Sequence, residues 1–156
     1  MRKLLFIALL FSNSIYSQSS WVWQNPLPNG NNLKSVVYIN SLTGFITGGG
    51  GLIQKTTDGG TTWVSKSTGV NKILNDIIFL NNNIGYAVGD FGTIVKTING
   101  GVNWELLNSG TTYRFNSVAF INLNTGYAVG QEMYKTTNSG DNWTIVDTVG
   151  FGYEIN

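Results

Sequence analysis

Two glutamates are the first residues of this sequence to consider for chemistry. Glu105 and Glu132 are the only glutamates between residues 33 and 148. A pair of carboxyl groups flanking a glycosidic bond is the machinery of glycoside hydrolysis. Glu105 directly follows a tryptophan on a predicted outer strand, where a solvated position is expected, and Glu132 lies in a predicted turn. We therefore do not expect catalysis from this pair.

The sequence has few other residues of the types that catalyse reactions or bind metals. The sequence contains no histidine and no cysteine, which excludes Ser-His-Asp and Cys-His nucleophile systems, disulfides and cysteine-ligated zinc. Asp58, Asp90 and Asp141 could serve as calcium ligands, but the acidic residues do not gather at the spacing of a calcium loop. The sequence accordingly predicts no enzyme, no metal site and no bound cofactor.

A nine-residue phrase that occurs three times indicates which elements hold these residues. It runs from Lys-Thr through Asp or Asn and Gly to Trp, and it occupies residues 55–63, 96–104 and 135–143. The first two copies are 41 residues apart and the last two 39, because the third repeat is two residues shorter between Gly130 and Lys135. A period of this length indicates an array in which each repeat is one supersecondary unit.

Each repeat is predicted to form four short antiparallel strands. In the second repeat, apolar runs rich in β-branched and large residues alternate with turn residues, and the last turn contains Asn-Gly, a strong hairpin signal. The four predicted strands are Leu74–Leu80, Gly85–Gly89, Thr93–Thr97 and Val102–Leu107. Helices should be nearly absent, because no helical period of useful length occurs after residue 20. Four strands every ~40 residues are typical of a β-propeller blade, so we predict an all-β fold.

The predicted domain is an incomplete propeller at residues 18–156. Its three blades correspond to repeats at about 33–67, 74–108 and 115–148, and Trp21–Pro28 is expected to form a lone N-terminal strand. Three blades do not close a ring, since propellers have at least about four. Uncovered blade faces expose apolar surface. We therefore expect either a fragment of a longer propeller or self-association through the open blade faces.

The repeated phrase has a structural interpretation. Asp58, Asn99 and Asn138 are expected to accept hydrogen bonds from backbone N–H groups of their own turns. The tryptophan at the end of each phrase is expected to lie early in the last strand and to pack into the blade core, with stacking on sugars as the alternative. These tryptophans are Trp63, Trp104 and Trp143.

The phrases resemble the Asp-box, or BNR repeat. The fuller pattern of Gly-Tyr-Ala-Val-Gly, Gly-Thr-Ile-Val-Lys-Thr and Asn-Gly-Gly-x-Asn-Trp is similar to the photosystem II stability and assembly factor-like repeat of secreted bacterial proteins, over roughly residues 21–148. The resemblance implies a propeller, and a chaperone-like assembly role where the host is photosynthetic. Asp-boxes are structural in sialidases, other glycosidases and non-catalytic propellers alike. A sialidase would need three arginines around its substrate, and Arg114 is the only one after residue 17, so that activity is rejected.

The N-terminus has the pattern of a signal peptide at residues 1–17. Two basic residues precede the apolar run Leu4–Phe11, and small and polar residues follow it; a buried first strand is the alternative. The run is too short to span a membrane, which takes about 20 residues. We expect a secreted, periplasmic or cell-surface protein. Residues 18–156 carry seven basic and eight acidic side chains, so no basic field exists to hold nucleic acid.

Binding residues are expected on the loops that join the second strand to the third and one blade to the next, because loops carry function more often than scaffolds do. An exposed Tyr-Arg pair beside a Phe is typical of protein contacts. The residues there that the repeat does not require are Asp90, Phe91, Tyr113, Arg114 and Glu132, with Gln131 beside the last. The alternative for Phe91 and Tyr113 is that they fill gaps between blades.

Two functions remain open from the sequence. The first is a secreted, non-catalytic propeller that serves as a protein-interaction or assembly scaffold. The second is a carbohydrate-binding or glycosidase-related propeller fragment whose site lay on missing blades. The expected partner is a protein or a glycan, in the cell envelope or outside the cell.

Overall fold

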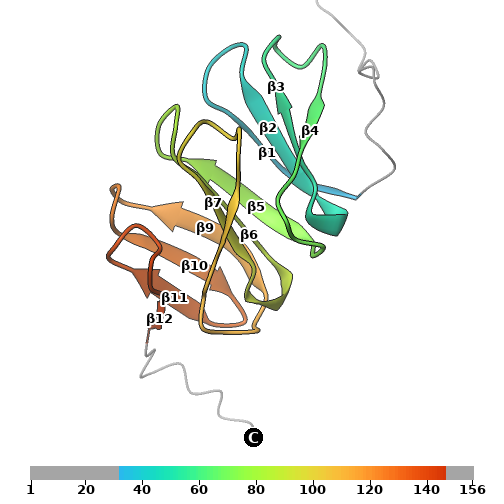
Figure 1. The fold of residues 1–156 in the computed structure, drawn as a ribbon. Coiled ribbons are helices and arrows are strands. Elements are labelled where there is room, and N and C mark those ends of the chain that lie inside the picture. The colour runs from blue at the N-terminus through green and yellow to red at the C-terminus, as the bar shows by residue number, and fades with distance from the viewer. Residues whose placement is uncertain (1–31, 147–156) are drawn as a thin grey trace, which may run out of the picture.

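The computed structural model describes residues 32–146, which form three four-stranded antiparallel sheets in a row (Figure 1). We call them blade 1 (β1–β4), blade 2 (β5–β8) and blade 3 (β9–β12). The strands are β1 Leu33–Tyr38, β2 Gly44–Gly48, β3 Ile53–Thr56, β4 Val64–Lys66, β5 Leu74–Phe79, β6 Gly85–Gly89, β7 Ile94–Thr97, β8 Glu105–Leu107, β9 Phe115–Phe120, β10 Gly126–Gly130, β11 Met133–Thr136 and β12 Thr144–Ile145. The signal peptide at residues 1–17 and the lone strand at 21–28 fall outside the described residues.

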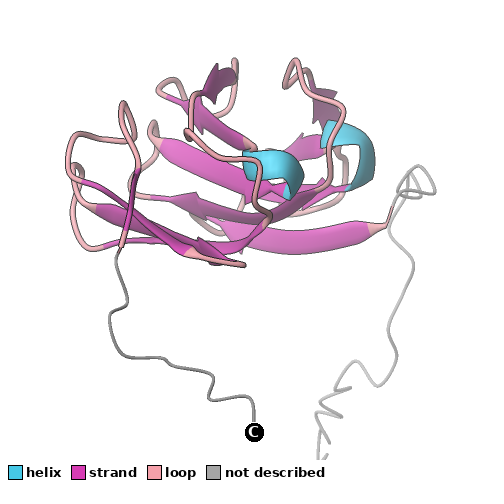
Figure 2. Ribbon diagram, turned by 90° about the horizontal axis from the view of Figure 1, so that it is seen from below, coloured by secondary structure: helices cyan, strands magenta, loops and turns pink. Residues whose placement is uncertain are grey.

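The all-β prediction is confirmed. The helical content of residues 32–146 consists of two single 3₁₀ turns, η1 (Gly49–Gly51) and η2 (Asp90–Gly92). Each of them joins the second strand of a blade to the third, and Figure 2 shows both on the same side of the molecule. Blade 3 has no such turn, because its shorter loop joins β10 to β11 through Gln131 and Glu132 alone. In the described part of the chain, no helix has the length and apolar character needed to cross a membrane.

The last strand of each blade begins later than predicted. Val102–Leu107 was expected as a strand in blade 2, whereas β8 begins at Glu105. The phrase before it is held as a turn, because the N–H of Asn103 donates to Asn99 Oδ1 at 3.0 Å and the N–H of Gly101 donates to Thr97 Oγ1 at 2.9 Å. Each tryptophan of the repeat therefore lies immediately before the last strand, at the end of this turn.

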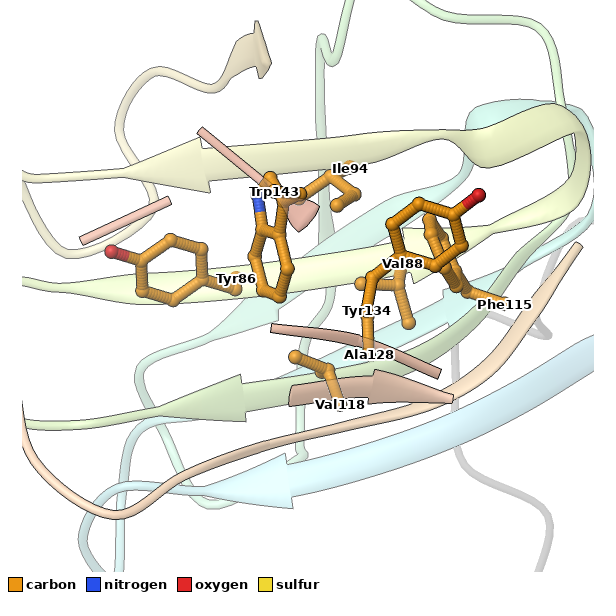
Figure 3. Packing of buried hydrophobic residues seen from close by; sticks show 8 residues of the cluster. All are labelled: Tyr86, Val88, Ile94, Phe115, Val118, Ala128, Tyr134 and Trp143. Carbon is orange, nitrogen blue, oxygen red and sulfur yellow. The ribbon is translucent and has the colours of Figure 1, made fainter. Parts of the chain in front are cut away.

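The apolar cores lie between the blades. Side chains alternate along a strand, so blade 2 packs one face on blade 1 and the other on blade 3, and every blade has one face toward the start of the row and one toward its end. We call these its trailing face and its leading face. The core between blades 2 and 3 joins Tyr86, Val88 and Ile94 to five residues of blade 3 (Figure 3). These five are Phe115, Val118, Ala128, Tyr134 and Trp143.

The first strands of the blades lie side by side, β1 against β5 and β5 against β9. Asp76 on β5 connects all three strands. Its Oδ1 accepts a hydrogen bond from Ser35 Oγ at 3.0 Å, and its Oδ2 accepts from Ser117 Oγ at 2.8 Å and from the N–H of Val118 at 3.0 Å. These bonds link the three first strands and so help to hold the blades, and the turns that they carry, in position relative to one another.

Candidate functional site

Phe91, at the middle of η2, combines backbone strain with solvent exposure. Its φ and ψ angles are 57° and 40°, in the left-handed region, and its side chain is 65% exposed. The corresponding residue of blade 1 is Gly50, with φ of 67°. Left-handed backbone costs a residue with a side chain about 1–2 kcal/mol. Blade 2 thus carries a strained, exposed phenylalanine where blade 1 has the residue that suits the conformation.

Hydrogen bonds from two neighbouring segments hold η2 in this conformation. The N–H of Asp90 donates to the carbonyl of Ile73 at 3.0 Å, and the N–H of Gly92 donates to the carbonyl of Tyr113 at 2.8 Å. Asn75 Nδ2 donates both to Asp90 Oδ1 at 3.0 Å and to the carbonyl of Phe115 at 2.8 Å. The turn that carries Phe91 is therefore tied to the beginning of β5 and to the link into blade 3.

A hollow of about 310 Å³ lies on one side of Phe91. Its lining consists of Asp90, Phe91, Thr112, Arg114 and Gln131. Arg114 and Gln131 are held together, because the N–H of Arg114 donates to Gln131 Oε1 at 3.1 Å and the N–H of Gln131 donates to the carbonyl of Arg114 at 3.2 Å. The hollow thus offers a carboxylate, a guanidinium and an amide beside an aromatic ring.

A second hollow, of about 340 Å³, lies against the same phenylalanine. Lys72, Phe91, Leu107 and Asn108 are among the residues that line it. The Lys72 ammonium lies 4.5 Å from the centroid of the Phe91 ring, which is within the range of a cation–π contact. Phe91 therefore forms a ridge between two hollows.

The structure brings together three of the five residues predicted for binding. Asp90, Phe91 and Arg114 line the first hollow. Tyr113, which is 46% exposed, and the exposed Glu132 are next to lining residues in the chain but do not line the hollow themselves. Because the side chains of Phe91 and Tyr113 are exposed, they do not fill gaps between blades, which was the alternative interpretation.

Sequence reasoning missed Lys72, Asn75 and Thr112. Lys72 and Tyr113 are 41 residues apart, so they occupy the same column of the repeat on successive links. An alignment of the segments that join successive blades would have placed Lys72 in the same position as Tyr113 and so among the candidate binding residues. Asn75 gave no such signal, because its role depends on how blade 3 packs beside blade 2.

The acidic residues considered for other chemistry are placed differently. Glu105 lies opposite Lys96 in the register of β7 and β8, next to the repeated turn of blade 2. Glu132 lies between β10 and β11, at the opposite end of blade 3. The hydroxyl and N–H of Thr62 donate to Asp58 and lower the pKa of its carboxyl group to about 2. Among residues 32–146, no group of three potential ligands could hold a metal ion.

The three tryptophans of the repeat pack beside a first-strand aromatic ring. Trp104 and Trp143 are buried and Trp63 is half-buried. Phe79 lies edge-on to Trp104 with ring centroids 6.0 Å apart, and Phe120 lies edge-on to Trp143 at 6.1 Å. Trp104 and Trp143 therefore pack inside the protein, as expected for the blade core.

The sequence matches the model of the family described as photosynthesis system II assembly factor YCF48 over residues 64–149, which is more than half of its 156 residues. No curated protein matches the chain.

Several solved structures have a similar fold. A structure described as YCF48 bound to D1 peptide is 22% identical, with a TM-score of 0.67 over 76% of this chain and 41% of that chain. YCF48 from Cyanidioschyzon merolae is 24% identical, with a TM-score of 0.66 over 78% of this chain and 39% of that chain. An ancestral GH74 enzyme is 24% identical, with a TM-score of 0.63 over 74% of this chain and 18% of that chain. The chain thus spans about two fifths of the length of the two YCF48 structures.

Proposed function

Because the chain belongs to the family of the photosynthesis system II assembly factor YCF48, we propose that it is a non-catalytic propeller that binds a segment of another protein. The binding surface is the side of the molecule that carries η2. Phe91 is its anchor, and the two hollows beside Phe91 receive side chains of the partner. We further propose that the protein acts outside the cytoplasm, a location supported by the signal-peptide pattern of residues 1–17.

The conformation of Phe91 is the observation that carries this proposal. A strained backbone persists only where its surroundings hold it, and such residues concentrate at binding sites. Aromatic residues, phenylalanine among them, and arginine are enriched in the interfaces between proteins. Blades 1 and 3 pack on both faces of blade 2, which carries Phe91. The 65% exposure of the Phe91 side chain is therefore not caused by an uncovered blade face.

The chemistry of the hollows favours a peptide. Asp90, Arg114 and Gln131 offer a hydrogen-bond acceptor, a donor fork and an amide next to an apolar ring. Backbone amides and mixed side chains of an extended segment present the complementary groups. The similar fold described as YCF48 bound to D1 peptide supports this proposal, because a peptide is the ligand that its description gives.

Carbohydrate binding is the second candidate. The exposed rings of Phe91 and Tyr113 favour it, since aromatic faces can stack on sugars, and the fold is shared with a GH74 enzyme. The mixture of charges in the first hollow makes it the weaker proposal. A peptide library and a glycan array together distinguish the two candidates.

The test is selection of binding peptides from a displayed library, followed by calorimetric measurement of the dissociation constant with the full chain. Phe91→Gly should weaken binding at least about tenfold, which corresponds to about 1.4 kcal/mol. The matched control is Ile98→Ala, because Ile98 is 70% exposed in the turn at the other end of blade 2 and should not affect binding. An unchanged affinity in Phe91→Gly would contradict the proposed site. A glycan-array signal that depends on Phe91, without peptide binding, would favour the second candidate.

Phe91→Gly should leave the fold intact. Glycine removes left-handed strain of about 1–2 kcal/mol, but it adds freedom to the unfolded chain worth about 0.5–1 kcal/mol and loses the contact with Lys72. These effects nearly cancel, so the free energy of unfolding should change by less than about 1 kcal/mol. Urea denaturation of both proteins measures it, and a much larger loss would mean that Phe91 is needed for folding rather than for binding.

A further inference from the structure

Blades 1 and 2, and blades 2 and 3, are joined by the same two contacts. An aromatic ring on the second strand of one blade stacks on a ring at the end of the first strand of the next blade. Phe45 and Phe79 have centroids 4.3 Å apart at 21°, and Tyr86 and Phe120 have centroids 4.3 Å apart at 22°. The junction is thus a repeated, directional contact between a leading face and a trailing face.

A lysine completes each junction. Lys55 Nζ of blade 1 donates to the carbonyl of Gly100 in blade 2 at 2.8 Å, and Lys96 Nζ of blade 2 donates to the carbonyl of Ser139 in blade 3 at 2.8 Å. Each lysine also lies over the leading-face ring of its own blade. The lysine at the start of the repeated phrase therefore links each of the first two blades to the turn of the following blade.

The leading face of blade 3 has the same lysine and aromatic ring, but no described blade covers them. Lys135 lies over the ring of Tyr127 at 5.7 Å, as the other two lysines lie over theirs. Tyr127 is half-buried, whereas Phe45 and Tyr86 are fully buried in the same position. Met133, which corresponds to two fully buried isoleucines, is 37% exposed.

The trailing face of blade 1 repeats the complementary groups. Tyr38 is 47% exposed and stands where blades 2 and 3 have Phe79 and Phe120. It lies edge-on to Trp63 at 6.3 Å, the arrangement that the other blades also have. Val36 is 61% exposed, while its counterparts Ile77 and Val118 are each 4% exposed. Gly59, the counterpart of the carbonyl acceptors Gly100 and Ser139, is exposed as well.

We propose that the leading face of blade 3 docks on the trailing face of blade 1 of a second copy of this chain. Tyr127 stacks on Tyr38 of that copy, and Lys135 Nζ donates to its Gly59 carbonyl. The occupant is inferred from complementarity, because both faces carry the residues that already pair twice within residues 32–146. Figure 1 shows the two faces at opposite ends of the row of blades, so one copy cannot satisfy both with its described blades.

The proposed contact is head-to-tail, which closes a ring where the rotation allows it. Two copies of three described blades supply six, which lies within the usual range of about four to eight blades for propellers. Association would bury the rings and aliphatic side chains that both faces expose, and the removal of this apolar surface from water favours it. The η2 surface is at the turns rather than on a blade face, so this proposal is independent of the proposed function.

The first test is the molar mass of the full chain by light scattering over a wide range of concentration. A two-chain species is expected, and a single-chain mass at every concentration would overturn the proposal. Tyr127→Asp and Tyr38→Asp should each raise the dissociation constant at least about tenfold, because each places a charge in the stack. Ile98→Asp is the control, since Ile98 is 70% exposed on blade 2 and lies on neither face.

Mixing the two variants tests the head-to-tail geometry. Tyr127→Asp has an intact trailing face and Tyr38→Asp has an intact leading face, so an equimolar mixture regains one native junction and should form two-chain species that neither variant forms alone. Failure of the mixture to associate would overturn the proposal. Circular dichroism shows that the variants are folded. Lys135→Met, which keeps the aliphatic stem but removes the donor, should weaken association without a loss of fold, and unchanged association in this variant would contradict the proposed hydrogen bond.

Discussion

Tyr86 shows how one residue of the repeat acquires a role in a single junction. Its ring is fully buried, and its hydroxyl donates to the carbonyl of Ser139 in blade 3 at 2.7 Å. Burial, together with the charge of Asp141, raises the pKa of Tyr86 to about 12. The corresponding residue of blade 1 is Phe45, which forms the same stack without a hydroxyl. Tyr86 therefore adds a hydrogen bond and a titratable group to a packing scheme that does not require either.

Tyr86→Phe should lower the free energy of unfolding at neutral pH by about 1 kcal/mol, because one buried hydrogen bond is lost and the stack is kept. In the wild type the folded-state pKa of about 12 lies above the ordinary tyrosine value of 10.0, so the phenol's contribution to stability is complete below pH 10 and is lost as the pH rises toward 12. The difference between the two proteins should consequently shrink in that window. Urea denaturation at neutral and alkaline pH measures it, and a constant difference would show that Tyr86 titrates normally.

The residues of the candidate site could be predicted only in part. Phe91 and Arg114 stood out because they depart from the repeat. The left-handed backbone of Phe91 has no signature in its own residue type, although the glycine in the same column of blade 1 is a hint. The contacts of Asn75 and Lys72 join segments whose proximity depends on the packing of blades, which no local pattern specifies.

At the level of elements, prediction was good where the boundaries have a local cause. β6 was predicted at Gly85–Gly89, as found. The glycine at its end is required by a close approach, since a Cβ at Gly89 would lie 1.9 Å from the carbonyl oxygen of Ile73. The last strand of blade 2 was predicted too long, because threonine and asparagine side chains of the repeated phrase hold the backbone before it in a turn. The apolar residues in that turn mimic the beginning of a strand.

The first strands are joined by Asp76, which replaces the serine found in this column in the other two blades. Asp76→Ala should lower the free energy of unfolding by about 2 kcal/mol, because it removes the acceptor of two hydroxyl groups and of the Val118 N–H. Asp76→Ser should cost less, since it restores the residue of the column. Asp141→Ala, at an exposed position, is the control and should stay within about 0.5 kcal/mol. Equal effects of all three changes in urea denaturation would mean that the bridge contributes nothing.

At the scale of the molecule, the blades depend on one another because each core is shared between two of them. Phe45 and Ile53 of blade 1 are buried only because blade 2 covers them, and Tyr86 and Ile94 of blade 2 are buried by blade 3. Arrays of this kind have a stability that is approximately the sum of repeat and junction terms. Blade 2 takes part in two junctions among the described blades, and blades 1 and 3 in one each.

Hydrogen exchange should therefore be slowest in blade 2. β6 is buried at every residue, while β10, its counterpart in blade 3, is partly exposed. Local opening requires less free energy where fewer buried contacts are broken, so peptides from β10 should exchange faster than peptides from β6 in dilute full-length protein. If the chain associates head-to-tail, raising the concentration should slow exchange in β10 and β1 but leave β6 almost unchanged, because only the end blades gain a junction. Mass spectrometry of the full chain and of Tyr127→Asp separates these effects: the variant should show the β6–β10 difference at every concentration. Equal protection of the three blades in the dilute variant would contradict the additive view of the junctions.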